Sequence, residues 1–359
     1  MRRPRRETSR LSEKEYERKE TEEMIARLLA GDHAAAAKII TQIENAREKR
    51  ETKELMEQIY PHTGRAWLIG VTGAPGVGKS TLVDRLIALI RSENYSVGVI
   101  GVDATSPFSG GALLGDRIRM TSCQGDKYVF IRSMATRGHL GGLSVATQGA
   151  VRVLDAMGMD VVLVETVGVG QIELDIMQIV DTVVLVVIPG GGDRIQAMKA
   201  GIMEIADIFV VNKSDHEGAD SAVSDIKMMQ EMNKARGSND QGVWIPPILK
   251  TVATSSSSQD VLPLLEAIRS HRQFLIDQQK FRKKREKHNY HEIVRSLTEE
   301  VEREVWKLLE ENKEIQLLLQ KMMNREMSPY QVSGFILSNF FKLGTGAPTL
   351  NEKRRRHEL

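Results

Sequence analysis

Cysteine is almost absent from this chain of 359 residues, in which Cys123 is the only one. A single cysteine excludes an intramolecular disulfide and fits a reducing compartment. Long hydrophobic runs are also lacking, so no segment is expected to span a membrane. The basic start of the chain has no apolar core of the kind found in secretory signals. We therefore expect a cytoplasmic protein, in preference to one of the mitochondrial matrix, with no membrane partner.

An excess of charge of one sign is missing as well. The 50 Lys and Arg residues nearly balance 48 Asp and Glu residues, which leaves a formal net charge of +2. Such a balance argues against a general affinity for nucleic acid. The hydrophobic share of 41% is ordinary for a globular protein and is enough for a sizeable core. The length suggests one large domain with additions, or two domains.

The clearest motif that is present is a glycine-rich stretch between a predicted strand and a predicted helix. It consists of Gly73, Ala74, Pro75, Gly76, Val77, Gly78, Lys79, Ser80 and Thr81. The spacing G-x-x-x-x-G-K-[ST] in this context is typical of a phosphate-binding P-loop, whose backbone N–H groups converge on phosphate oxygens. We expect Lys79 to reach the β- and γ-phosphates of a nucleotide and Ser80 to hold Mg²⁺ through its hydroxyl.

Near-continuous apolar runs alternate with helical stretches in the middle of the chain. They lie at 66–71, 97–102, 128–131, 161–164, 183–188 and 208–211, and a further apolar stretch precedes Thr254. This alternation predicts an α/β fold with a mostly parallel sheet that is covered on both faces. Ligands of such sheets bind beyond the carboxyl ends of the strands. The loops after the strands are therefore where functional residues are expected.

Acidic residues follow two of the predicted strands. Asp103 ends the second strand, and Asp116 lies in the loop after it. Glu165 ends the fourth strand and is followed by Gly168, an arrangement typical of the Walker B motif. We expect the three carboxylates to order Mg²⁺ or an attacking water, and Gly168 to donate its N–H to a γ-phosphate. For Asp103 and Asp116 a helix cap or a turn is the alternative.

The sixth predicted strand ends in the sequence N-K-x-D, formed by Asn212, Lys213, Ser214 and Asp215. A carboxylate at Asp215 can accept hydrogen bonds from the N1–H and the exocyclic amine of guanine, which adenine cannot supply. We expect Asn212 to support the loop, Lys213 to lie over the base and Thr254 to contact its outer edge. These residues predict GTP and GDP as the bound nucleotides.

The loop after the fifth predicted strand, residues 189–201, holds three successive glycines as well as Asp193, Arg194 and Lys199. It is either a mobile connector or a switch. From about residue 276 onward, apolar residues recur every three or four positions among many charges. This narrow seam indicates a long helix, and it favours a dimerisation arm over an intramolecular bundle.

Taken together, these motifs resemble the MeaB/ArgK-type G proteins, GTPase chaperones of adenosylcobalamin-dependent acyl-CoA mutases. The matching stretches are GAPGVGKST, SGGALLGDRIRM, TRGHLGGLS, ETVGVGQ, GDRIQAMKAGIMEIAD and NKSD. The resemblance implies a SIMIBI-class P-loop GTPase that covers roughly residues 61–275. It further implies a helical N-terminal extension (1–60), a C-terminal helical dimerisation arm (276–343) and a polar tail (344–359).

The same resemblance implies a mechanism of coupling. Residues 103–120 would be one switch, residues 165–176, with Gln171, a second, and residues 189–201 a third that signals to the mutase. Adenosylcobalamin would be loaded and replaced under control of the GTP state, and it would belong to the partner mutase. The alternatives are a metallochaperone-type GTPase, a transport-associated nucleotide-dependent kinase and a nucleotide-gated dimeric scaffold. Scattered histidines argue against the first and N-K-S-D against the second, because it selects guanine.

Overall fold

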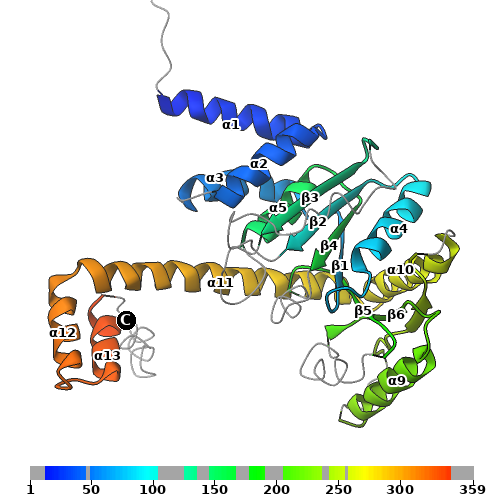
Figure 1. The fold of residues 1–359 in the computed structure, drawn as a ribbon. Helices are drawn as coiled ribbons and strands as arrows, with labels where there is room; N and C mark the ends of the chain where they lie inside the picture. The colour runs from blue at the N-terminus through cyan, green and yellow to red at the C-terminus, as the bar shows by residue number, and fades with distance from the viewer. Residues whose placement is uncertain are drawn as a thin grey trace, which may run out of the picture. The chain divides into compact units, whose positions relative to one another are not determined.

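The computed structural model describes most of the chain, and its residues fall into two compact units (Figure 1). The described ranges are 13–45, 49–103, 125–135, 145–166, 178–190, 205–236, 242–254 and 258–340. The first unit comprises Met1–His288 and the second Asn289–Leu359. In the described part of the chain, no helix has both the length and the apolar character needed to cross a membrane.

The first unit begins with helices α1 (Glu13–Leu29), α2 (His33–Asn45) and α3 (Lys49–Ile59) and a 3-10 turn, η1 (Tyr60–His62). Gly31 ends the first helix with a φ of +84°, a left-handed conformation that suits glycine. Asp32 then caps α2, because its Oδ1 accepts from the N–H groups of Ala34 and Ala35 at 2.8 and 3.3 Å. Gly31 and Asp32 together set the turn between α1 and α2.

A parallel sheet of seven strands forms the centre of this unit, in the order β3-β2-β4-β1-β5-β6-β7. The strands are β1 (Trp67–Thr72), β2 (Val97–Asp103), β3 (Val129–Ala135), β4 (Val161–Thr166), β5 (Thr182–Val187), β6 (Ile208–Asn212) and β7 (Ile248–Thr251). The six strands expected from the apolar runs are confirmed. The short edge strand β7 occupies the further apolar stretch before Thr254.

Helices cover both faces of the sheet because alternate strand residues point to opposite sides. On one face, Ile69 and Val71 pack with α4 (Lys79–Ser92) and α10 (Leu262–Asp277), the latter preceded by the 3-10 turn η4 (Ser258–Val261). The other face is covered by the N-terminal helices and, in addition, by α5 (Val145–Ala156) and α9 (Ala219–Arg236). The predicted α/β fold, with a mostly parallel sheet covered on both faces, is therefore confirmed. Since all strands are parallel, their carboxyl ends share one edge.

The second unit is helical. The long helix α11 (Lys280–Glu311) starts in the first unit, and α12 (Lys313–Met323) and α13 (Pro329–Asn339) follow it. Ile315, Val332 and Ile336 form a small core between these helices. Ser328 begins α13 with a reciprocal pair of hydrogen bonds to Gln331, a capping box that fixes the start of this helix.

Candidate nucleotide-binding site

Two glycines of the P-loop stand where no side chain fits. A Cβ on Gly73 would lie 2.2 Å from the carbonyl oxygen of Val186 on β5, and its φ is +144°. A Cβ on Gly78 would lie 2.4 Å from Nδ2 of Asn212, and its φ is +96°. Both positions therefore require glycine on steric and conformational grounds. The loop is packed against the neighbouring strand β5 at one end and against the end of β6 at the other.

Lys79 begins α4 and is buried in the loop, with 6% of its surface exposed. Its ammonium donates to the carbonyls of Gly73 and Ala74 at 2.7 and 2.9 Å. The charge therefore lies inside the curve of the P-loop, where the phosphates of a nucleotide are expected to bind. Pro75 and Gly76 form the exposed tip, while Val77 is buried.

Ser80, in the first turn of α4, contacts Glu165, near the carboxyl end of β4. The Ser80 hydroxyl donates to Oε1 of Glu165 at 2.6 Å, and Glu165 is 4% exposed. At the last residues of β1 and β4, the hydroxyls of Thr72 and Thr166 share a hydrogen bond of 2.9 Å. The P-loop serine and the acid near the end of β4 are thus in direct contact.

Asp103 is the last residue of β2, one position beyond the pairing of Val102 with Thr166. Its backbone is therefore at the same edge of the sheet as Glu165. This placement agrees with a role near the phosphates, which remains a prediction.

Asn212, at the end of β6, links the N-K-x-D loop to the P-loop. Its Nδ2 donates to the carbonyl of Val77 at 2.8 Å, and its Oδ1 accepts from Thr251 Oγ1 and Ala253 N, each at 3.1 Å. Asn212 is 2% exposed, so its amide oxygen and one N–H are bonded in the interior. These contacts connect the end of β6 to the P-loop and to the residues that follow β7.

Lys213 and Asp215, which follow Asn212 in the chain, lie on the surface. Lys213 has a φ of +56°, and its Nζ donates to the carbonyl of Gly76 at 3.1 Å. The side chain of Asp215 is 56% exposed, with His216 Nε2 at 3.8 Å. Thr254 is also exposed, next to the bonded Ala253. The Asp215 carboxylate is exposed and follows, by two residues, a lysine that contacts the P-loop, so the arrangement is compatible with guanine binding.

Six of the predicted site residues lie outside the described residues. They are Asp116, Gly168, Gln171, Asp193, Arg194 and Lys199. The structure also adds residues that sequence patterns do not single out, namely Thr72, Thr166 and Thr251. Threonines at strand ends are common, and nothing in their local sequence distinguishes these three.

A comparison with protein families identifies the family of the chain. Residues 36–310 match the family model of the methylmalonyl-CoA mutase-associated GTPase MeaB. The chain belongs to the MeaB family. The matched range contains the whole sheet, the P-loop and the N-K-x-D loop. This member of the family is therefore a P-loop GTPase.

Relatives of this MeaB-family chain agree with that membership. A Pyrococcus horikoshii protein that is named as a GTPase is 48% identical over 88% of this chain and 97% of its own length. The mouse methylmalonic aciduria type A homolog is 28% identical over 87% of this chain and 78% of its own length. The crystal structure of an LAO/AO transport system kinase aligns with a TM-score of 0.63 at 27% identity, covering 91% of this chain and 99% of that one.

Proposed function

We propose that this GTPase is a chaperone of an adenosylcobalamin-dependent acyl-CoA mutase, whose cofactor loading it gates and whose activity it restores. The observation that carries the proposal is the match of residues 36–310 to a family described as mutase-associated. The matched range includes the whole nucleotide site and most of α11. Methylmalonyl-CoA mutase or a related acyl-CoA mutase is the proposed partner, and adenosylcobalamin reaches this chain only through it.

We infer that GTP and GDP bind with their phosphates on the P-loop and guanine on Asp215. Gly73 to Thr81 would surround the phosphates, and Lys79 would neutralise the charge that develops on the β- and γ-phosphates. Asn212 keeps the P-loop and the N-K-x-D loop at a fixed separation. The sites for the phosphates and for the base would therefore be held in a fixed arrangement. Such positioning and charge stabilisation account for most of the catalysis in phosphoryl transfer.

Mg²⁺ is the metal that this site would take. The Ser80 hydroxyl and the Glu165 carboxylate are oxygen ligands of the hard type that Mg²⁺ prefers, and they lie 2.6 Å apart beside the P-loop. Asp103 and Asp116 are further candidate ligands by their position in the sequence. When bound, Mg²⁺ would offset the charge of the phosphate oxygens. Glu165 and Asp103 would hold the metal or its water, and Gly168 would contact the γ-phosphate.

The loop 189–201 is proposed to report the nucleotide state to the mutase. Its support is the placement of its first residues: β5 leads into it, and the carbonyl of Val186 on β5 lies against Gly73 of the P-loop. Gly218, which follows the N-K-x-D loop, lies beside Pro189 and Gly190. A movement of either nucleotide-binding loop would therefore reach the start of this segment. Gln171, in the loop after β4, is proposed to act in the same coupling.

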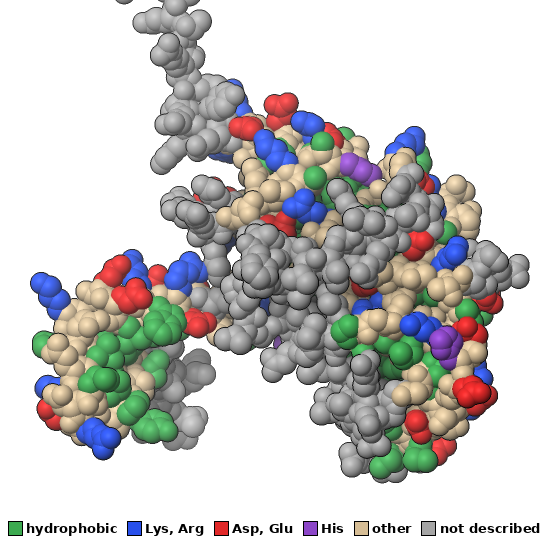
Figure 2. Space-filling view, in the orientation of Figure 1, with side chains coloured by type: hydrophobic (Ala, Val, Ile, Leu, Met, Phe, Trp, Pro, Cys, Tyr) green, Lys and Arg blue, Asp and Glu red, His purple; other side chains and the backbone are tan. Residues whose placement is uncertain are grey.

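Homodimer formation through the C-terminal helices is the remaining part of the proposal. On α11, Tyr290, Val294, Leu297 and Val301 follow one another at spacings of four, three and four residues and are 71%, 62%, 60% and 39% exposed. Figure 2 shows further hydrophobic side chains gathered on the C-terminal helices. A heptad seam with this exposure fits a helix that packs on a second copy. Leu297→Glu should then give a monomer by sedimentation, while Glu302→Gln should not.

The decisive experiment for the chaperone proposal is a GTPase assay with and without the candidate mutase. Lys199→Ala should leave nucleotide affinity and basal hydrolysis within a few-fold, because Lys199 lies outside the P-loop and the base-binding loop. It should strongly reduce the stimulation by the mutase. Full stimulation in the variant would move the coupling to residues 165–171. No complex and no stimulation with any adenosylcobalamin-dependent acyl-CoA mutase would overturn the chaperone role while leaving the GTPase intact.

A further inference from the structure

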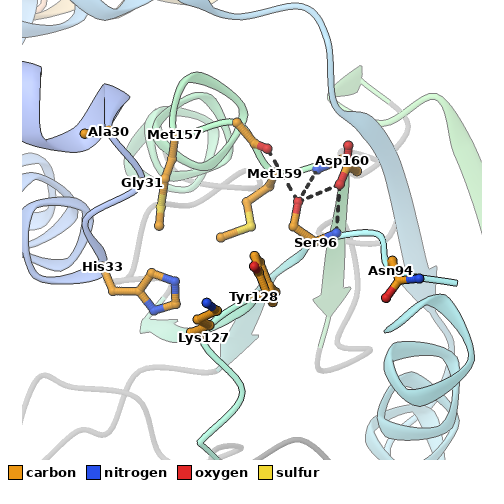
Figure 3. Close-up of a pocket in the computed structure, with 11 residues that line it drawn as sticks. Ala30, Gly31, His33, Asn94, Ser96, Lys127, Tyr128, Met157, Met159 and Asp160 are labelled. Atoms are coloured by element: carbon orange, nitrogen blue, oxygen red, sulfur yellow. Dashed lines mark hydrogen bonds between the residues drawn. The ribbon is translucent and has the colours of Figure 1, made fainter. Parts of the chain in front are cut away.

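A cavity lies at the opposite edge of the sheet from the P-loop. It measures about 600 Å³, is open to solvent, and lies between the turn that joins α1 to α2 and the segments that lead into β2, β3 and β4 (Figure 3). This volume is within the range of about 300–1,000 Å³ that is typical of small-molecule sites. The nucleotide-binding residues of the other edge are not among those that line it. The two sites are therefore separate, and the chemistry of this one must be read from its own lining.

Two basic side chains, His33 and Lys127, lie at one end of the cavity (Figure 3). The Lys127 ammonium lies 4.9 Å from the centre of the Tyr128 ring, and the His33 ring meets Phe130 edge-on at 5.4 Å. Both contacts are with aromatic rings. Among the residues that the structure describes, neither side chain has an acidic partner within salt-bridge distance.

The acid next to Lys127 in the sequence is already engaged elsewhere. Asp126 binds the Arg91 guanidinium at 2.8 Å and the N–H of Tyr128 at 2.8 Å. These hydrogen bonds, with smaller contributions from the charges of Arg91 and Lys127, hold the pKa of Asp126 below its ordinary value. Lys127 therefore acts on Asp126 only through space, and its donors remain directed to the cavity and solvent. A cation in this situation favours an anionic ligand.

Backbone groups offer little to an anion here. The start of α2 adjoins the cavity, but Asp32 already accepts from the N–H groups of Ala34 and Ala35. A carboxylate at that helix end also opposes a second negative charge. Recognition of an anion would therefore depend on the side chains of Lys127 and His33.

The middle of the cavity is apolar. Met157 and Met159 are 7% and 5% exposed, and Figure 3 shows their side chains directed toward the centre. The Tyr128 ring is 48% exposed and faces the same space. Thioether side chains adapt to ligands of varied shape and make favourable contacts with aromatic groups. This part of the cavity fits an aliphatic or aromatic body.

The far end is a fixed polar wall. Ser96 donates to Asp160 Oδ2 from both its N–H and its hydroxyl, at 2.8 and 2.7 Å, and Asp160 N donates back to the Ser96 hydroxyl at 3.0 Å (Figure 3). These hydrogen bonds hold Ser96 and Asp160 together, so the two residues form a boundary of the cavity at this end. The Asp160 charge at this end also directs an anionic group to the other.

We propose that this cavity binds a small anionic amphiphile. Its carboxylate or phosphate would lie on Lys127 and His33, and its apolar body would lie between Met157, Met159 and Tyr128. Because the α1–α2 turn forms one wall and the sheet the other, the ligand would stabilise the contact of the N-terminal helices with the sheet. The proposal does not depend on the chaperone function or on the mutase.

Methionine methyl NMR tests this proposal directly. The full chain, saturated with GDP so that the P-loop is occupied, is labelled at the methyl groups of its 16 methionines. Met157→Leu and Met159→Leu assign the two signals. The probes are hexyl phosphate, hexanoate and the uncharged hexanol. We expect at least one anion to shift both signals saturably and to bind at least about tenfold more tightly than hexanol, a ratio that corresponds to about 1.4 kcal/mol.

Substitutions then assign the charge. Lys127→Ala should weaken binding of the anion at least about tenfold and leave hexanol unchanged, as expected for the loss of one charged contact. Lys227→Ala, which removes an exposed lysine on α9, is the matched control and should have no effect. The proposal is overturned if neither anion shifts the two signals, if hexanol binds as well as the anions, or if Lys127→Ala binds them like the unmodified protein.

Discussion

Arg285 of α11 and Asp181, the residue directly before β5, form a bidentate ion pair. The Arg285 Nε and Nη2 atoms lie 2.9 and 2.7 Å from the two carboxylate oxygens of Asp181, whose side chain is 1% exposed. Arg285 also donates to the carbonyls of Gly64 and Ala66, each at 2.6 Å. Burial would lower the pKa of Arg285, but the hydrogen bond and charge of Asp181 and the charge of Asp155 raise it. The first turns of α11 are thereby fixed to the edge of the sheet opposite the nucleotide.

Arg285→Met should be strongly destabilising, because it leaves the buried Asp181 carboxylate without its counter-charge. Loss of one partner of a buried pair costs about 3–5 kcal/mol. The measurement is urea unfolding of the full chain. Arg282→Met is the control on the same helix, since Arg282 is 90% exposed and pairs only with Glu286 in the next turn. Equal stabilities of the two variants would show that the pair contributes little.

Asp207 makes stability depend on pH. Burial would raise its pKa, but hydrogen bonding to His271, the charges of Lys284 and His271 and the N–H of Val183 together lower it. A group with a lowered folded-state pKa contributes stability above its unfolded-state pKa of about 3.9, and this is lost as the pH falls through the folded-state value. The contribution of Asp207 is therefore present at neutral pH and lost in acid.

Asp207→Asn should remove this acid dependence. At pH 7 the variant should be less stable by about 1–3 kcal/mol, because Lys284 and His271 lose a charged acceptor. As the pH falls below about 4 and through the lower folded-state pKa of Asp207, the free energies of unfolding of the variant and of the unmodified protein should approach each other. Urea titrations at a series of pH values measure both quantities. Parallel curves over the whole range would assign the acid dependence to other carboxylates.

The fold and the centre of the site could be predicted because their signals are local. The P-loop and N-K-x-D each lie within a few consecutive residues, and parallel strands bring their loops to one edge. The contact between Asn212 and Val77, 135 positions apart, follows from that rule only approximately. The pair of Asp181 and Arg285, 104 positions apart, could not be predicted, because both are ordinary charged residues in sequence and only packing selects them.

Asn212→Ala should weaken nucleotide binding although Asn212 need not touch the nucleotide. The variant loses the bond to Val77 and leaves Ala253 N and Thr251 without their acceptor, at about 1–3 kcal/mol for each buried group. We expect GDP affinity, measured by calorimetry, to fall at least about tenfold. Thr251→Val removes only one of the three bonds and should have a much smaller effect. Similar losses in both variants would show that the brace to the P-loop is unimportant.

Asp215→Asn should change which base is bound. The Asp215 carboxylate is exposed, and the amide that replaces it can donate where the carboxylate only accepts. Affinity should move from GDP to xanthosine diphosphate, with a change in ratio of up to about 10⁴-fold. Asp220→Asn, on the surface of α9, should leave the preference unchanged. Equal affinity of the unmodified protein for ATP and GTP would refute the assignment of Asp215.

Ser80 and Glu165 should affect hydrolysis more than nucleotide binding. Glu165→Gln keeps an oxygen that can accept from Ser80 but removes the charge that would hold Mg²⁺ or its water. We expect kcat for GTP hydrolysis to fall by about 10²-fold or more, with GTP affinity changed only a few-fold. Ser80→Ala should instead raise the Mg²⁺ concentration needed for half-maximal activity. Asp103→Ala, at the neighbouring strand end, distinguishes the two candidate acids: if Glu165→Gln keeps full turnover and Asp103→Ala does not, Asp103 is the essential carboxylate and the contact between Ser80 and Glu165 serves only to hold the loop.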